Sequence, residues 1–149
     1  MTESTFSKTI MNTFNAIMKG ILRSPLHGVV SKSILLIRFT GRKSGKTYTT
    51  PISYSTQGEY IVLVTNGNWW KNLRGGAPVS VRLRGKDHKG FAEAIADDKA
   101  AITEGVQRHL EQIPSDAKYY GVSLDASRKP NPEQVAQAAQ KLVLIRIRL

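Results

Sequence analysis

Five short segments with the character of β-strands follow one another between residues 34 and 96, and their connections limit the folds open to the chain. The segments are ILLIRFT (34–40), TYTTPISYS (47–55), EYIVLVT (59–65), VSVRLRG (79–85) and GFAEAIA (90–96). Each carries alternating or continuous apolar residues. The connections are polar or rich in glycine, and they are too short for the helical crossovers of a parallel sheet. The sequence therefore predicts a mainly antiparallel sheet.

A sixth segment of the same kind, KLVLIRIRL, occupies residues 141–149. Six short strands in an open sheet would leave long unpaired edges, and closing the sheet into a barrel removes them. We therefore expect a small closed or split barrel, mainly β with flanking helices, in the α+β class.

Three further segments have helical periodicity. In TFSKTIMNTFNAIMKGILR (about 5–23) the apolar residues recur at helical spacing, which predicts an amphipathic helix packed on the core. The alternative for this helix is peripheral contact with the inner face of a membrane. A second helix is predicted for DKAAITEGVQRHLEQI (98–113) and a third for EQVAQAAQ (133–140), with Pro132 in its first turn. We expect all of this to form one domain, residues 1–149.

Composition narrows the location and the partners. Twenty-two Lys and Arg against eleven Asp and Glu leave a formal net charge of +11, which predicts an anionic partner. The chain has no cysteine, no secretory leader pattern and no apolar run near the roughly 20 residues that a membrane span needs. A cytoplasmic location is the expectation. His27, His88 and His109 stand far apart without paired ligands, so no metal site is expected.

The stretch TGRKSGKT (40–47) is close to a phosphate-binding P-loop, but its two glycines have three residues between them instead of four. The β-branched and aromatic residues that follow predict a strand, whereas a P-loop leads into a helix. ATP or GTP binding is therefore not expected. The glycines allow unusual backbone angles, and Arg42, Lys43, Ser44 and Lys46 offer donors to an anion. A solvated basic turn is the alternative.

A second feature is TNGNWWKNLRGGAP (65–78), in which two adjacent tryptophans precede several basic residues. The pattern predicts a short helix that Asn68 caps and that ends at the glycine pair. In one interpretation the tryptophans cover one end of the barrel. In the other, one indole supports a flat ring while Asn72 hydrogen-bonds the polar edge of that ring.

Taken together, TGRKSGK…TTP followed about two dozen residues later by WWKNLRGGAP.V.V resembles the deazaflavin-dependent nitroreductase and quinone reductase family, whose members use coenzyme F420 on a split β-barrel. The resemblance covers about residues 35–84. It implies a six-stranded antiparallel split β-barrel of the FMN-binding kind.

The resemblance also implies a cofactor site. It assigns the phosphate and carboxylate tail to Arg42, Lys43, Ser44 and Gly45. It places Pro51, Thr65 and Asn66 beside the deazaflavin ring, with Trp69 and Asn72 in the short helix that follows. Some family members have a lysine where this chain has Asn66, which leaves flavin mononucleotide (FMN) open as the cofactor.

Hydride transfer needs little from the protein beyond holding the cofactor against the acceptor, because the cofactor supplies the chemistry. A hydroxyl that stabilises negative charge on a quinone or nitro oxygen would suffice. Ser53 and Tyr54 lie on opposite faces of one predicted strand, and Tyr119 or Tyr120 could close over the pocket from a loop. These four are the catalytic candidates; packing with wet hydroxyls is the alternative for the tyrosines.

We therefore expect an oxidoreductase that transfers a hydride from reduced F420 to a quinone-like or nitroaromatic small molecule, with a homodimer left open. Three alternatives remain at this stage: an FMN-binding split-barrel protein, a noncatalytic carrier of a lipophilic ligand, and a basic module that binds nucleic acid. The last is disfavoured because no nucleic-acid recognition motif is present.

Overall fold

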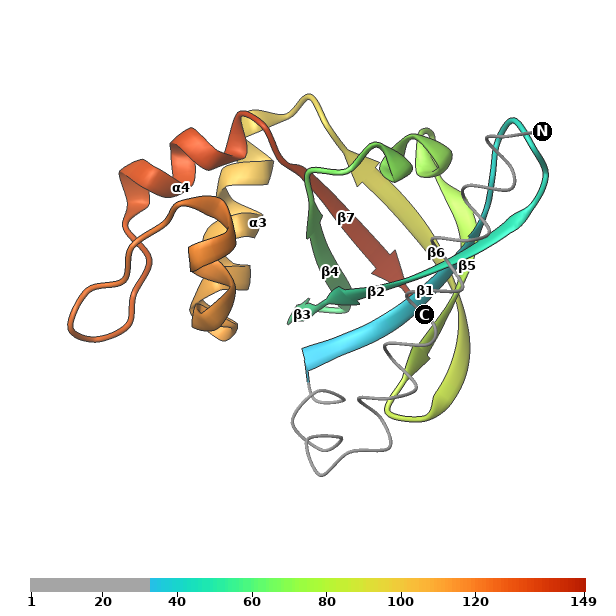
Figure 1. Cartoon of the computed structure of the whole chain (residues 1–149), viewed down its shortest axis with the longest axis horizontal. Coiled ribbons are helices and arrows are strands. Elements are labelled where there is room, and N and C mark those ends of the chain that lie inside the picture. Colours follow the sequence, from blue (N-terminus) through green and yellow to red (C-terminus); the bar gives the residue numbers. More distant parts are fainter. Residues whose placement is uncertain (1–32) are drawn as a thin grey trace.

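The computed structural model describes residues 33–149; the amphipathic helix expected at residues 5–23 lies outside this range, as does His27. The described residues contain a seven-stranded sheet in the order β2-β1-β5-β6-β7-β4-β3 (Figure 1). All of its pairings are antiparallel, as predicted. The strands are β1 (Ile34–Thr40), β2 (Thr47–Ser53), β3 (Ser55–Gln57), β4 (Tyr60–Thr65), β5 (Ala77–Leu83), β6 (Lys86–Ile95) and β7 (Val143–Arg148).

The expected count of six strands is one too low, because the segment 47–55 is two strands and not one. Tyr54 separates β2 from β3, and its amide donates a 2.9 Å hydrogen bond to the carbonyl of Ser33. The chain thereby passes from one edge of the sheet, β2, directly to the other edge, β3. Figure 1 shows β2 and β4 leaving this corner in different directions, which gives the half-open barrel.

The interior of the barrel is filled by alternate residues of the strands, because successive side chains of a strand point to opposite faces. The buried residues of this cluster are Leu35, Ile37, Phe39, Tyr54, Ile61, Leu63, Leu73, Val79, Val81, Ala92, Ile145 and Ile147. The cluster draws on β1, β4, β5, β6 and β7, so one core positions both ends of the sheet.

Two helices cover the outer face of β4 and β7 (Figure 1). The α3 helix (Lys99–Gln112) begins where the Asp98 side chain accepts a hydrogen bond from the Ala101 amide. The α4 helix (Pro132–Ala139) begins in the same way at Asn131, with Pro132 in its first turn. Both predicted helices are confirmed. No helix among residues 33–149 is long and apolar enough to cross a membrane.

Two short 3₁₀ helices complete the described chain: η1 (Asn68–Leu73) and η2 (Pro114–Tyr120). The prediction that Asn68 caps η1 is wrong. Asn68 is the first helical residue, the preceding Gly67 is the cap, and no side chain accepts a bond there. Figure 1 shows η1 at the end of β4. Gly67 has the extended backbone angles of a cap residue, with φ −84° and ψ 154°, so the helix begins one residue earlier than predicted.

Candidate functional site

The basic loop between β1 and β2 is closed by its own backbone. The amide of Gly41 donates to the carbonyl of Lys46 at 2.7 Å, and the amide of Gly45 donates to the carbonyl of Gly41 at 2.9 Å. Gly45 has φ +69°, a left-handed conformation that glycine adopts without strain. The hydroxyl of Ser44 lies 3.1 Å from that of Tyr48, which ties the loop to β2. The sequence thus builds a tight, preformed turn.

This turn leaves donors available for an anion. Within residues 33–149, the amides of Lys43 and Ser44 have no hydrogen-bond partner, and no acidic group lies in ion-pair contact with Arg42, Lys43 or Lys46. All three cationic residues are exposed. Successive amides beside a left-handed residue form a concave anion-binding arrangement, and the cations around it add favourable charge. The loop is therefore suited to a phosphate or a carboxylate.

Trp69 of η1 lies at the same end of the barrel. Its ring stacks on Phe39 with centroids 5.3 Å apart, and its indole Nε1 donates to the Thr65 hydroxyl at 3.1 Å. The same hydroxyl accepts a 3.1 Å bond from the Gly67 amide. Trp69 is half-buried, so the indole is held in one orientation while part of its surface stays accessible. Trp70 is also half-buried, and the Arg74 guanidinium lies 5.0 Å from its ring centroid.

Asn72 joins the loop to η1. Its side-chain oxygen accepts the Arg42 amide at 2.9 Å, and its side-chain nitrogen donates to the carbonyl of Trp69 at 2.9 Å. Both ends of the amide are therefore engaged within the protein. The expected bond from Asn72 to the edge of a ring would have to be made in addition to these contacts.

The structure brings most of the expected cofactor residues to one end of the barrel. Hydrogen bonds and stacking connect Arg42, Ser44, Thr65, Trp69 and Asn72, with Lys43 and Gly45 in the same turn and the exposed Asn66 next to Thr65. Pro51 stands apart. It is half-buried within β2, opposite Leu36 and four residues after Thr47, where β2 begins next to the loop.

The four hydroxyl candidates occupy different environments. Tyr54 is 7% exposed and belongs to the barrel interior. Tyr119 is 70% exposed, with the Lys118 ammonium 5.2 Å from its ring centroid. Tyr120 is half-buried, and its hydroxyl donates to the carbonyl of Val64 on β4 at 3.4 Å, next to Thr65. Among the four, Tyr120 is the one whose hydroxyl is bonded to the strand that carries Thr65.

Ser53 lies at the far end of β2 from the basic loop. Seven residues of strand separate the two by roughly 20 Å. Its hydroxyl donates a long, 3.4 Å hydrogen bond to Asp116 of η2. The same carboxylate acts on Tyr120: burial, and secondly the charge of Asp116, raise the pKa of Tyr120 from 10.0 to about 12. Tyr120 is therefore a neutral hydrogen-bond donor at physiological pH.

Sequence reasoning missed a buried polar chain next to these residues. The Nδ1 of His109 lies 2.8 Å from the Ser55 hydroxyl, and its Nε2 lies 3.1 Å from Asp116 Oδ2. His109 and Ser55 are 1% and 2% exposed. The partners come from β3, α3 and η2, and no local spacing in the sequence signals their meeting. Such burial excludes a substrate. These three hydrogen-bonded side chains therefore serve as a structural link between the helices and the sheet.

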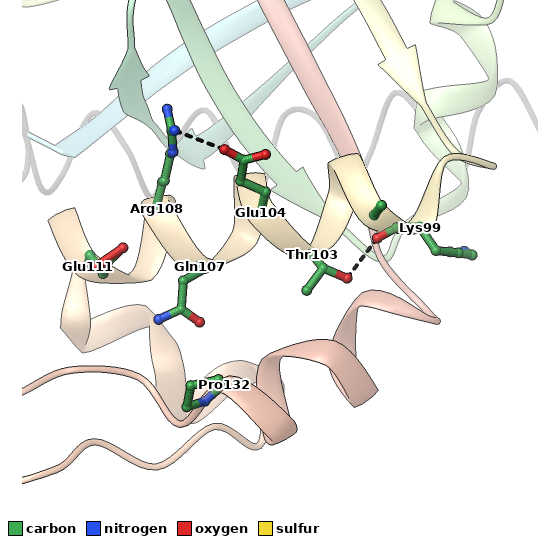
Figure 2. Close-up of a pocket in the computed structure, with 8 residues that line it drawn as sticks. Lys99, Thr103, Glu104, Gln107, Arg108, Glu111 and Pro132 are labelled. Carbon is green, nitrogen blue, oxygen red and sulfur yellow. Dashed lines mark hydrogen bonds and ion pairs between the residues drawn. The ribbon is translucent and has the colours of Figure 1, made fainter.

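A groove of about 770 Å³ lies elsewhere, along the exposed side of α3 (Figure 2). It is lined by Lys99, Ala100, Thr103, Glu104, Gln107, Arg108, Glu111 and Pro132. Figure 2 shows that Glu104 and Arg108 pair with each other, at 2.8 Å, and Pro132 contributes from the start of α4. None of the site residues expected from the sequence lines this groove. The end of the barrel is the better candidate site.

The described part of the chain shows no cluster of His, Cys, Asp and Glu that could hold a metal ion. The polar residues around the barrel end are donors: amides, cations and hydroxyls. Donors of this kind suit an anionic organic ligand.

Solved structures share the fold at low sequence identity. An F420-H2 dependent reductase, FDR-A, is 19% identical with a TM-score of 0.51; the match covers 77% of this chain and 94% of that one. The heme storage protein HutZ from Vibrio cholerae is 11% identical with a TM-score of 0.53, covering 84% and 88%. A domain-swapped dimer is 18% identical with a TM-score of 0.50, covering 89% and 94%. These likenesses establish the split-barrel fold.

The family follows from the sequence comparison. No curated protein matches the chain. The family model of the F420H(2)-dependent quinone reductases matches residues 17–121, which include the basic loop, η1 and η2. That match spans more than half of the 149 residues. The protein belongs to the F420H(2)-dependent quinone reductase family.

Proposed function

We propose that this protein is an oxidoreductase that transfers a hydride from reduced F420 to a quinone-like or nitroaromatic small molecule. The observation that carries the proposal is the preformed anion site: two partnerless amides in a turn, surrounded by three cations without acidic partners among the described residues. The family match supports F420 as the occupant. The phosphate and carboxylate tail of F420 is negatively charged and so complements the cationic loop.

The residues at the barrel end fit such a cofactor. The turn at Lys43 and Ser44 would hold the tail, and Trp69, fixed between Phe39 and Thr65, would support the planar ring. The bound cofactor supplies the hydride, and the protein supplies binding, orientation and exclusion of water. The interior cluster beneath Trp69 keeps that side of the site dry.

Tyr120 is the hydroxyl that we assign to the acceptor. A neutral phenol can donate a hydrogen bond to the oxygen of a quinone or nitro group as negative charge develops there. The hydrogen bond from its hydroxyl to the Val64 carbonyl is long, at 3.4 Å, so the hydroxyl can exchange this acceptor for a substrate oxygen at little cost in free energy. Asp116, bonded to Ser53 and close to Tyr120, holds η2 in place for this role.

Titration of oxidised and reduced F420 into the purified protein, followed by deazaflavin fluorescence, tests the proposal. We expect saturable binding that weakens about tenfold in Lys43→Ala, because a charge-assisted contact is lost. Lys129→Ala is the matched control, since Lys129 is an exposed lysine in the separate loop before α4. Equal affinity in wild type and Lys43→Ala would remove the loop from the site.

Turnover assays separate the acceptor classes. Reduced F420 is mixed with the protein and either a soluble naphthoquinone or a nitroaromatic compound, and cofactor oxidation is measured. The family match leads us to expect the quinone to react with the higher kcat/KM. Replacing F420 by FMN in the same titration tests the alternative cofactor, whose phosphate would use the same turn. Light scattering of the purified protein measures whether a homodimer forms.

A further inference from the structure

We infer that Asn72 is a positioning residue, which fixes the anion-binding turn at a set distance from Trp69 and does not act on the cofactor directly. The inference rests on the proposed function and assigns one residue a task within it. A cofactor with a charged tail and a planar ring must be bound at both ends, by the anion-binding turn and by Trp69. The distance between these two binding elements therefore controls affinity.

The two hydrogen bonds of the Asn72 side chain link the anion-binding turn to Trp69. Its oxygen accepts the Arg42 amide at 2.9 Å, and its nitrogen donates to the Trp69 carbonyl at 2.9 Å. No other hydrogen bond or ion pair joins residues 41–46 to residues 68–73 in the described structure. Thirty residues separate Arg42 from Asn72 along the chain, so this contact is set by the fold and not by local sequence.

The same bonds determine which donors face the ligand. The Arg42 amide is occupied by Asn72, and the amides of Gly41, Gly45 and Lys46 are occupied within the turn. This leaves the amides of Lys43 and Ser44 as the two without a partner among the described residues. Without Asn72 the Arg42 peptide can rotate, and the two amides that follow it lose their fixed position. A turn that must be ordered on binding costs affinity that a preformed turn does not.

Asn68 provides a matched comparison on the same helix. It is an exposed asparagine four residues before Asn72, and its side chain makes no hydrogen bond to the described residues. Asn68→Ala therefore removes the same chemical group from η1 without touching the link. A difference between the two variants reports the link and not a general effect of losing an asparagine.

The decisive experiment compares two ligands on three proteins. Wild type, Asn72→Ala and Asn68→Ala are titrated with F420 and with the deazaflavin fragment that lacks the phosphate and carboxylate tail. We expect Asn72→Ala to bind F420 roughly three- to tenfold more weakly than wild type, the range of one or two net hydrogen bonds. The fragment should bind wild type and Asn72→Ala equally, and Asn68→Ala should match wild type with both ligands.

A second measurement needs no ligand. Amide hydrogen exchange at Arg42 should be protected in wild type and in Asn68→Ala and should speed up in Asn72→Ala, because the acceptor of that amide is gone. A purely local role in η1 would leave exchange at Arg42 unchanged, and that result overturns the inference.

The outcomes distinguish this inference from the proposed function. If Asn72→Ala weakens the fragment as much as F420, the residue supports the ring or the fold and the inference fails while the function stands. If it weakens neither, the inference fails in the same way. If wild type binds neither F420 nor the fragment, the proposed function itself fails, and the positioning role fails with it.

Discussion

The imidazole Nε2 of His109 lies 3.1 Å from Oδ2 of Asp116, in a place where His109 is 1% exposed and Asp116 is 8% exposed. The other ring nitrogen lies 2.8 Å from the Ser55 hydroxyl, so both sides of the imidazole have partners. Three elements, β3, α3 and η2, meet at this one side chain. Because Asp116 also accepts the Ser53 hydroxyl, the pair connects the helices to the corner at which the barrel splits.

Removing His109 should therefore destabilise the fold. We expect His109→Ala to lower the free energy of unfolding by about 2–4 kcal/mol, because it leaves a cavity and two buried polar groups without partners. His88→Ala is the matched control: His88 is half-buried on β6 without a described partner, and its loss should cost less than about 1 kcal/mol. Urea denaturation measures both. If both variants lost the same free energy of unfolding, the buried His109–Asp116 pair would contribute no more than a half-buried histidine on β6.

Gly105 gives a second stability prediction, at the contact between α3 and β7. A Cβ added there would lie 2.5 Å from the Leu144 side chain, and Leu144 is 0% exposed. Alanine favours a helix by about 1 kcal/mol over glycine, but the overlap with a fixed core residue should outweigh this gain. We expect a net loss of about 1–2 kcal/mol in Gly105→Ala by thermal or urea denaturation. Glu104→Ala, which breaks only the exposed pair with Arg108, should change stability by less than about 0.5 kcal/mol.

The fold was predictable from the sequence wherever local pattern decides it. Apolar periodicity and short turns gave the antiparallel sheet, and capping residues gave α3 and α4. The division at Tyr54 was not predictable, because it depends on the Tyr54 amide meeting Ser33 across the sheet. The start of β6 was also missed. Residues 86–89 are polar and read as a turn, whereas the turn is confined to Arg84 and Gly85, with φ of 51° and 80°.

The candidate site was predictable in its parts and not in its connections. Residue spacing identified the basic loop and the tryptophan helix as two separate features. Their link through Asn72 joins atoms thirty residues apart, which no sequence pattern specifies. The environments of the hydroxyls were equally unpredictable from the sequence. Ser53 and Tyr54 are adjacent in one segment, yet Ser53 is bonded to Asp116 and Tyr54 is buried in the barrel interior. Burial of that kind follows from the packed structure alone.

Tyr120 should ionise at unusually high pH. Burial and the nearby Asp116 charge raise its pKa from 10.0 to about 12, so folding favours the neutral phenol. Its contribution to stability is therefore fully present below pH 10 and is lost as pH rises through about 12. Tyrosinate absorbance measures this directly: just above pH 10, wild type and Tyr120→Phe should show the same number of ionised tyrosines. An extra ionised tyrosine in wild type at that pH would contradict the prediction. In Asp116→Asn, ionisation should shift to lower pH without reaching the ordinary value, since burial is the larger cause.

The same residue should affect turnover more than cofactor binding. If the Tyr120 hydroxyl donates to the acceptor oxygen, Tyr120→Phe should lower kcat for quinone reduction by about 10- to 100-fold, the cost of one lost donor to developing charge. The affinity for F420 should stay the same, because Tyr120 packs in the cluster that contains Val64 and makes no hydrogen bond, within the described residues, to the tail-binding turn, which is bonded to η1. Tyr60→Phe is the matched control: Tyr60 is half-buried on β4 and faces Arg146 and Arg148, whose contacts are with its ring. Steady-state kinetics with a naphthoquinone give both parameters, and an unchanged kcat in Tyr120→Phe would assign the donor role to another group.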